Sequence, residues 1–302
     1  MAQRRLPQRR LPANDFWRLF AMQRLTHIAD LRDWLAQQRR LGKTIALVPT
    51  MGALHAGHMA LVESARQACD LVVMSIFVNP RQFGPNEDFD AYPRDLDGDC
   101  ALAQAHGVDA VFAPANEAMY PHAAGPLILA GRQANMLCGA SRPGHFDGVV
   151  QVVCKLFNLV QPDRAFFGQK DAQQVAIIQT FVRDYNLPLE ISVIPVVREA
   201  DGLAKSSRNI YLSAPERAQA PAIHQALRLC RDRLQSGQAP EAALQAARAH
   251  IAEQIPGSRI DYLELLAWPD LLALQDSDRN CIALAAVYLG RTRLIDNITF
   301  QR

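Results

Sequence analysis

Hydrophobic positions along the chain follow two different periods. Ile28, Leu31, Trp34 and Leu35 recur at helical spacing, which predicts a helix that Gly42 ends. Continuous apolar runs of strand length follow, with helical patterns between them. The predicted strands are 44–48, 71–78, 109–113, 165–167 and 189–197, and the predicted helices are 58–69, 101–106, 149–160 and 173–185.

Strands that are apolar on both faces and alternate with helices are typical of a parallel sheet covered on both sides. We therefore expect a doubly wound, Rossmann-like α/β domain over residues 22–197. Such domains bind ligands beyond the carboxyl ends of their strands. The chemistry should then lie in the loops after Val48, Val78, Phe167 and Val197.

The pattern changes after about residue 200. Ser213 and Glu216 form a capping-box pattern around Pro215, which predicts the start of a long helix. A second helix is predicted over 241–254. Strands are predicted at 260–266, 282–289 and 292–295. Residues 198–302 are therefore expected to form a smaller α+β domain.

Composition indicates a globular protein and excludes several classes. The 302 residues are 49% hydrophobic and 21% charged, which is too apolar for a disordered chain. No uncharged apolar run reaches the roughly 18 residues that a membrane helix needs. The 32 basic and 30 acidic residues leave a net charge of +2, too balanced to indicate a nucleic-acid partner. The six cysteines are scattered without a C-x-x-C pair, as expected of free thiols in the cytoplasm.

The first 21 residues are Arg-rich and lack the apolar segment of a secretory signal. We expect a disordered extension, from a start codon assigned too early. A nucleic-acid contact, a membrane contact and a targeting role remain alternatives.

The first candidate loop joins a predicted buried strand to a helix and contains His55, Gly57 and His58. A helix N-terminus attracts phosphate, and Gly57 carries no Cβ to obstruct its approach. The two imidazoles are three residues apart and therefore lie on one face of the first turn. They can donate hydrogen bonds to phosphate oxygens or release a proton as charge develops.

Three further loops carry suitable polar groups. Gln82 follows a strand and offers both a donor and an acceptor, which suits a hydroxy acid. Lys170 can hold a phosphate, while Asp171 can bind ribose hydroxyls or cap the next helix. The segment 205–208 places two cations and two hydroxyls in four residues, which suits a polyphosphate undergoing displacement or a solvated interdomain loop.

Several sequence motifs resemble those of a known enzyme family. H-x-G-H after the first strand, with a later K-x-S-S-R-type loop, resembles the nucleotidyltransferase superfamily. Five ordered motifs together resemble the pantoate–β-alanine ligase family. They are PTMGALHAGH (49–58), SIFVNPRQF (75–83), SRPGHFDG (141–148), FGQKD (167–171) and VREADGLAKSSRN (197–209), and GRTRLIDN (290–297) also looks like the family's C-terminus.

The resemblance implies ATP-dependent condensation of pantoate with β-alanine through a pantoyl-adenylate, with Mg²⁺. It also implies a homodimer, with neither nucleic acid nor a membrane as a partner. It leaves the Mg²⁺ ligands unassigned. His58 matches the position assigned as proton donor, and His55, Lys170 and Arg208 are expected to complete the catalytic set. The expected ATP-binding residues are Met51, Gly52, Ala53, Leu54, His55, Ala56, Gly57, His58, Gly168, Gln169, Lys170, Asp171, Val197, Lys205, Ser206, Ser207 and Arg208.

The acid-binding end is implied in the same way. Gln82 and Gln174 match the pantoate ligands, with Gln82 also near β-alanine. Asp99, Arg142 and His145 fall where the family lines the pantoate/β-alanine end. Lys205 departs from the pattern, because the family usually has an apolar residue there, and it could add a phosphate contact.

Other functions remain as rivals. The nearest is another adenylyl- or cytidylyltransferase, or a remnant of a class I tRNA synthetase. Pantoate-dependent exchange of pyrophosphate into ATP would separate these. A nucleic-acid-binding or scaffolding module that uses the Arg-rich extension would instead show steeply salt-dependent affinity.

Overall fold

The computed structural model describes residues 22–85, 87, 89–122 and 125–302. The Arg-rich extension lies outside these residues, so the expectations for it stay predictions. Within the described chain, no helix is long and apolar enough to cross a bilayer.

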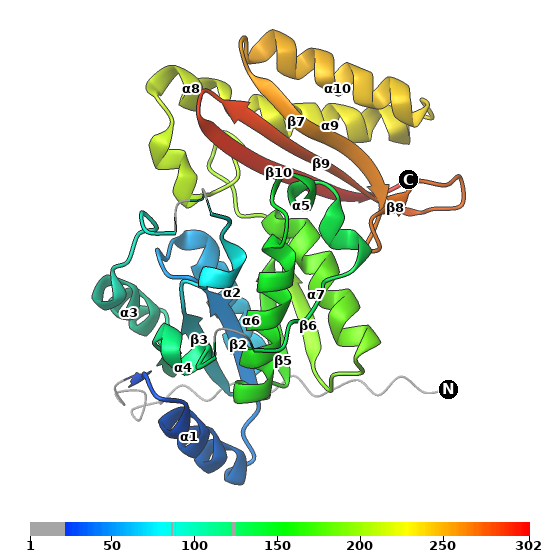
Figure 1. The fold of residues 1–302 in the computed structure, drawn as a ribbon. Coiled ribbons are helices and arrows are strands. Elements are labelled where there is room, and N and C mark those ends of the chain that lie inside the picture. The colour runs from blue at the N-terminus through cyan, green and yellow to red at the C-terminus, as the bar shows by residue number, and fades with distance from the viewer. Residues whose placement is uncertain (1–21, 86, 88, 123–124) are drawn as a thin grey trace, which may run out of the picture.

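The chain up to Ile194 forms a six-stranded parallel sheet, in the order β1-β4-β3-β2-β5-β6 (Figure 1). This confirms the doubly wound α/β fold. Because β3 lies on one side of β2 and β5 on the other, the order reverses between β2 and β5. That switch point is where such sheets bind their ligands. The strands are β1 (Gln23–Leu25), β2 (Ile45–Thr50), β3 (Leu71–Ile76), β4 (Ala110–Phe112), β5 (Arg164–Gly168) and β6 (Glu190–Ile194).

Helices cover both faces of this sheet because its strands are apolar on both sides. Ile45 and Leu47 of β2 pack into the core under α1, α6 and α7. Ala46 and Val48 pack instead under α2 and α3. The helices are α1 (Ile28–Arg40), α2 (Ala56–Ala68), α3 (Leu96–Ala105), α4 (Asn116–Met119), α5 (Cys138–Ser141), α6 (His145–Val160) and α7 (Ala172–Asp184).

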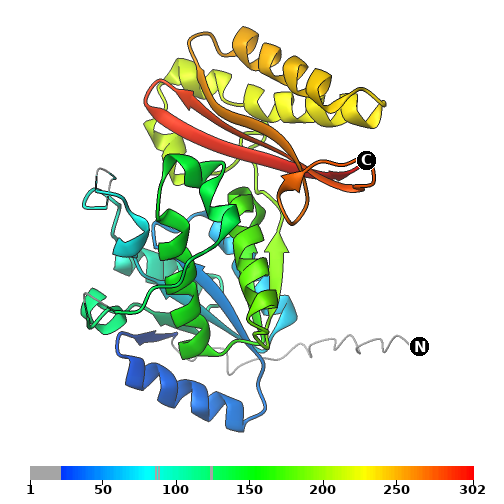
Figure 2. The ribbon, with the colours of Figure 1, turned by 45° about the vertical axis from the view of Figure 1, so that its right-hand side comes forward.

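The C-terminal part forms a separate antiparallel sheet in the order β10-β9-β7-β8. Its strands are β7 (Arg259–Ala267), β8 (Leu272–Ala273), β9 (Asn280–Leu289) and β10 (Thr292–Gln301). One face packs under α9 (Ala222–Gln235) and α10 (Pro240–Gln254). Figure 2 shows the other face turned toward the first sheet and its helices. There Leu266 and Leu284 meet Ala172 and Ala176 of α7. The smaller α+β unit is thus confirmed, while its boundary at residue 198 stays a prediction.

Several predicted boundaries were wrong. The expected long helix after Ser213 is two helices, α8 (Ala214–Gln219) and α9, because Pro221 lacks the N–H that would continue α8. The helix after the first loop begins at Ala56 rather than residue 58. Strand β3 ends at Ile76, two residues before the predicted end at Val78. Strands β1 and β8 were not predicted, since runs this short carry little periodicity.

Short 3₁₀ turns complete the loops at the carboxyl edge. They are η2 (Pro80–Gln82), η3 (Arg132–Asn135), η4 (Gln169–Asp171) and η5 (Ser207–Tyr211).

Candidate active site

A cleft of about 280 Å³ opens at the switch point, beyond the carboxyl ends of β2, β3, β5 and β6. The four predicted loops meet in its wall. The first loop contributes Met51, Ala53, His55, Gly57 and His58, whereas Gly52, Leu54 and Ala56 contribute no lining. The other predicted residues in the wall are Gln82, Arg142, His145, Gly168, Lys170, Asp171, Gln174, Val197, Lys205, Ser206, Ser207 and Arg208.

Two imidazoles cap the first turn of α2. The Nδ1 of His55 accepts a hydrogen bond from the Gly57 N–H at 3.0 Å. The Nδ1 of His58 accepts one from the His55 N–H at 3.2 Å. The ring centroids are 4.2 Å apart. The helix thus uses its own histidines where Ser and Glu usually form a capping box.

These bonds fix the protonation of both rings. A backbone N–H can only donate, so each Nδ1 must be unprotonated and each neutral ring carries its proton on Nε2. Burial, together with neighbouring His55 and Lys170, lowers the pKa of His58 to about 3. Burial and Lys170 also lower the pKa of His55. Two neutral imidazoles therefore offer Nε2–H donors to the cleft, which favours hydrogen bonding over proton release.

The His55 ring needs a glycine at position 57, in addition to any need of a ligand for space there. A Cβ at this position would lie 2.7 Å from Cε1 of His55, too close for a real contact. The absence of a side chain lets the His55 ring fold back onto the helix end. The sequence therefore needs glycine between the two histidines for the cap itself to form.

Asp99 and Gln169 lie outside the cleft wall. The buried Asp99 carboxylate accepts hydrogen bonds from the N–H groups of Ala53 and Leu54, at 2.9 and 2.8 Å. It therefore supports the first loop from behind. The Gln169 amide donates to Oδ1 of Asn297 on the second sheet, at 3.2 Å.

Cationic groups from two loops meet across the cleft. Lys170 Nζ lies 3.4 Å from the Ser206 hydroxyl, which also accepts from the Arg208 N–H at 3.2 Å. Lys205 forms an ion pair with Glu199 at 3.2 Å. Asp171 begins α7 without a side-chain capping bond, so capping is not its role. Lys170, Lys205 and Arg208 make this part of the cleft wall electropositive.

Amide side chains form another part of the cleft wall. Gln82 is buried, and its Oε1 accepts from the Asn79 Nδ2 at 3.1 Å. Asn79 also donates to the Gly148 carbonyl at 3.0 Å. A Cβ on Gly148 would lie 2.1 Å from the Arg81 carbonyl oxygen, so only glycine lets α6 pass this close to η2. The position of Gln82 therefore depends on that contact.

Arg142 and His145 brace the same turn. Arg142 pairs with Glu87 through two bonds, with Nε to Oε1 at 2.7 Å, and this contact lowers the pKa of Glu87. His145 Nδ1 lies 2.8 Å from the Gln82 carbonyl, which can only accept, so the ring carries its proton there. Its Nε2 then accepts from Arg142 at 3.1 Å. Burial lowers the pKa of His145 to about 4, which keeps the ring neutral.

Sequence reasoning missed Asn79 and Glu87. Asn79 stands in a quoted motif shortly before Gln82, and its burial could have been suspected from that place. Glu87 lies in a polar segment with no periodicity, and its partner Arg142 is 55 residues away. No local pattern could have paired them.

A family model, pantoate-beta-alanine ligase, matches residues 23–299. The chain belongs to this family. It is 61% identical over 280 residues to the pantothenate synthetase of Lysinibacillus sphaericus (strain C3-41), covering 92% of this chain and 98% of that one. It is 51% identical to the pantothenate synthetase of Moorella thermoacetica, covering 93% and 99%.

Solved structures of pantoate–β-alanine ligases have the same fold. Pantothenate synthetase from Thermus thermophilus superposes with a TM-score of 0.85 at 44% identity, covering 92% of this chain and 99% of that one. Pantoate-beta-alanine ligase from Francisella tularensis, complexed with beta-gamma ATP and beta-alanine, gives 0.75 at 34% identity, covering 92% and 97%. The resemblance carried by the five motifs is thereby confirmed for the family, and the chain is an enzyme of this ligase class.

Proposed function

We propose that this protein condenses pantoate with β-alanine at the expense of ATP, through a pantoyl-adenylate. The observation that carries the proposal is one cleft whose wall combines two groups of side chains. One group is the neutral His55–His58 pair with the cations of two loops. The other includes the buried amide of Gln82. The first group suits a triphosphate and the second suits a small hydroxy acid.

In the first step, a pantoate carboxylate oxygen attacks the α-phosphorus of ATP, and the bond to pyrophosphate breaks. A carboxylate with a pKa near that of Glu, about 4.3, is already ionised at pH 7. The step therefore needs no general base. It needs alignment and donors placed on the developing negative charge.

The cleft supplies those donors. His55 and His58 offer Nε2–H groups, and Lys170 and Arg208 offer charge. Because the imidazoles are neutral, they stabilise the phosphoryl oxygens as hydrogen-bond donors rather than as acids. We accordingly propose His58 as an electrostatic participant, in place of the proton donor that the resemblance implies.

The residues present fit a Mg²⁺ ion carried on the substrate phosphates. The described chain has no cluster of three His, Cys, Asp or Glu side chains that could hold a metal. Among the described residues that line the cleft, Asp171 is the one with a carboxylate. Mg²⁺ is commonly bound through one or two carboxylates and the phosphates. Asp171 would hold the ion there, and the ion would neutralise phosphate charge.

In the second step, the β-alanine amine attacks the acyl carbon and the bond from that carbon to the AMP oxygen breaks. Pantothenate and AMP result, and the amine gives up a proton. No nucleophilic residue is needed on the protein, since the activated acyl group is carried on AMP. Gln82 and Gln174 are proposed to orient pantoate, with Gln82 also near the incoming amine.

Arg142 and His145 are proposed to act on substrate through the turn that bears Gln82. Both residues contact the Gln82 carbonyl and each other, so their polar groups are already bonded within that turn. We propose that Asp99 likewise supports the ATP loop. We also propose a cytoplasmic protein that forms the homodimer implied by the family resemblance, and light scattering of the purified protein tests the dimer.

The direct test measures AMP and pantothenate with each substrate omitted in turn. Both products should form only when pantoate, β-alanine, ATP and Mg²⁺ are all present. Formation of ADP in place of AMP, or of AMP without pantoate, would refute the proposal.

A further inference from the structure

Strand β10 carries two adjacent buried polar residues, Asp296 and Asn297, which are 6% and 2% exposed. Neighbouring residues on a strand point to opposite faces of the sheet. Leu294 and Ile298, on either side of Asp296, pack into the core beneath α9 and α10. An apolar residue would be expected between them. Two buried polar groups at such positions need a specific set of partners.

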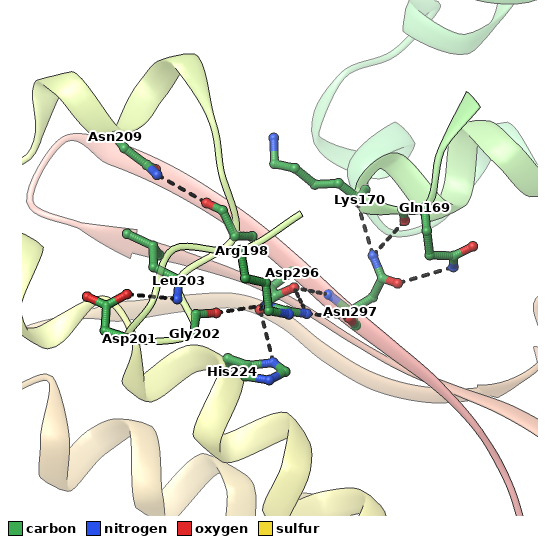
Figure 3. Close-up of polar contacts among 11 residues, drawn as sticks. Gln169, Lys170, Arg198, Asp201, Gly202, Leu203, Asn209, His224, Asp296 and Asn297 are labelled. Atoms are coloured by element: carbon green, nitrogen blue, oxygen red, sulfur yellow. Dashed lines mark hydrogen bonds and ion pairs between the residues drawn. The ribbon is translucent and has the colours of Figure 1, made fainter. Parts of the chain in front are cut away.

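Asn297 points at the turn that carries Lys170. Its Nδ2 donates to the backbone carbonyls of Gln169 and Lys170, at 2.9 and 3.1 Å. Its Oδ1 accepts from the Gln169 side chain at 3.2 Å. Figure 3 shows these three bonds converging on Asn297. One amide of the second sheet therefore fixes the backbone from which Lys170 extends.

Asp296 holds a different loop. Its carboxylate forms a bidentate pair with Arg198, with oxygen–nitrogen distances of 2.7 and 2.9 Å. Arg198 also donates to the carbonyls of Gly202 and Asn297, at 3.0 and 3.2 Å. His224 Nδ1 stands 3.6 Å from the same carboxylate, beyond hydrogen-bond distance. Figure 3 shows Arg198 enclosed between these groups.

Arg198 begins a short hairpin that leads into the polar loop. It pairs with Ala204 in an antiparallel bridge. The Lys205 N–H donates to the Val197 carbonyl at 2.9 Å. The Asn209 side chain donates to the Ala204 carbonyl at 3.1 Å. Holding Arg198 and Gly202 therefore fixes the point from which residues 205–208 enter the cleft.

We infer that Asp296 and Asn297 are positioning residues that hold the two phosphate-facing loops in register across the two sheets. This inference rests on the proposed function. Lys170 on one loop and Ser206 on the other are 3.4 Å apart. The first loop is tied to Asn297, and the second is tied through Arg198 to the neighbouring Asp296. Neither Asp296 nor Asn297 touches the reacting atoms. They act through Lys170 and through the 205–208 loop.

The contacts of Asp296 and Asn297 with the two loops are together called the clamp. The clamp is tested by hydrogen exchange of backbone amides in the Asp296→Asn and Asn297→Ala variants. We expect at least about tenfold faster exchange of amides 168–172 in the Asn297 variant and of amides 198–206 in the Asp296 variant. Local opening of each loop costs less free energy in these variants, because the side-chain bonds that would have to break are already missing. Val287→Ala, in the same core of the second sheet, is the control for general destabilisation. Unchanged protection relative to that control would overturn the inference.

The functional consequence is tested by pantoate-dependent exchange of pyrophosphate into ATP. Displacement of the loop by about 1 Å can cost up to about 100-fold in rate. Asn297→Ala should lower the exchange rate at saturating ATP by roughly 10- to 100-fold and change the pantoate KM by less than about twofold. In a Lys170→Ala background the same substitution should have little further effect, since it acts through Lys170. Fully additive losses would refute the positioning role.

Asn297→Ser, which retains one donor, serves if the alanine variant folds poorly, and it should show a smaller loss in both measurements. Wild-type protein without pantoate-dependent exchange would refute the proposed function. The amide protection would still decide whether the clamp exists.

Discussion

Replacing His58 by alanine and by asparagine separates its two roles. Its Nδ1 caps α2 through the His55 N–H at 3.2 Å, and the residue lines the cleft, where we propose that its Nε2–H donates to ATP. Alanine removes both contacts. Asparagine places an oxygen where Nδ1 stood, and it lacks a donor at the position of Nε2.

The structure sets a different magnitude for each role. Loss of a capping bond costs about 1 kcal/mol, which lowers the Tm of a protein of this size by about 2–4 °C. Loss of one donor on developing charge costs about 2–4 kcal/mol, or roughly 30- to 900-fold in adenylation rate. We therefore expect the adenylation rate to fall by the same factor in both variants. Only His58→Ala should also show the lower Tm.

The assay is exchange of pyrophosphate into ATP with pantoate and without β-alanine, alongside thermal unfolding. Near-normal exchange in His58→Asn would show that the ring serves only as a cap. A raised KM for ATP at unchanged kcat would show that the donor acts equally on substrate and transition state, which contradicts the mechanism.

Three further expectations concern the same cleft. Gln82→Ala should raise the pantoate KM and leave the ATP KM unchanged; an unchanged pantoate KM would remove Gln82 from binding. Gly148→Ala places a Cβ 2.1 Å from the Arg81 carbonyl, so it should destabilise the fold by about 1–3 kcal/mol and also raise the pantoate KM. Folding lowers the pKa of His58 from 6.5 to about 3, so its contribution to stability is complete above pH 6.5 and is lost on acidification. Between pH 7.5 and 5, wild type should therefore lose about 2 kcal/mol more unfolding free energy than His58→Asn in urea titrations, and equal losses would contradict the neutral ring.

Much of the architecture could be read from the sequence because the first sheet is apolar on both faces. Continuous apolar runs marked β2, β3 and β5, and the loops after them lie at one edge as expected. Predictions failed where the signal was short. Strand β8 has two residues, and a single proline divides α8 from α9.

The cleft could be predicted residue by residue only where chemistry was local. His55 and His58 were predicted to lie together because they share one helical turn. Their mutual cap could not be predicted, since imidazoles rarely replace Ser and Glu there. Asp99 contacts the backbone of Ala53, which is 46 residues away, and that pairing arises only on folding. The clamp at Asn297 is more distant still, reaching Gln169 across 128 residues.

The central claim is that the cleft transfers an adenylyl group to a carboxylate oxygen of pantoate. Pantoate labelled with ¹⁸O in its carboxyl group tests it most directly, with mass spectrometry of the products after complete conversion. The account predicts one labelled oxygen in AMP, because the acyl–oxygen bond breaks when β-alanine attacks. Unlabelled AMP, or label recovered in inorganic phosphate or pyrophosphate, would contradict it.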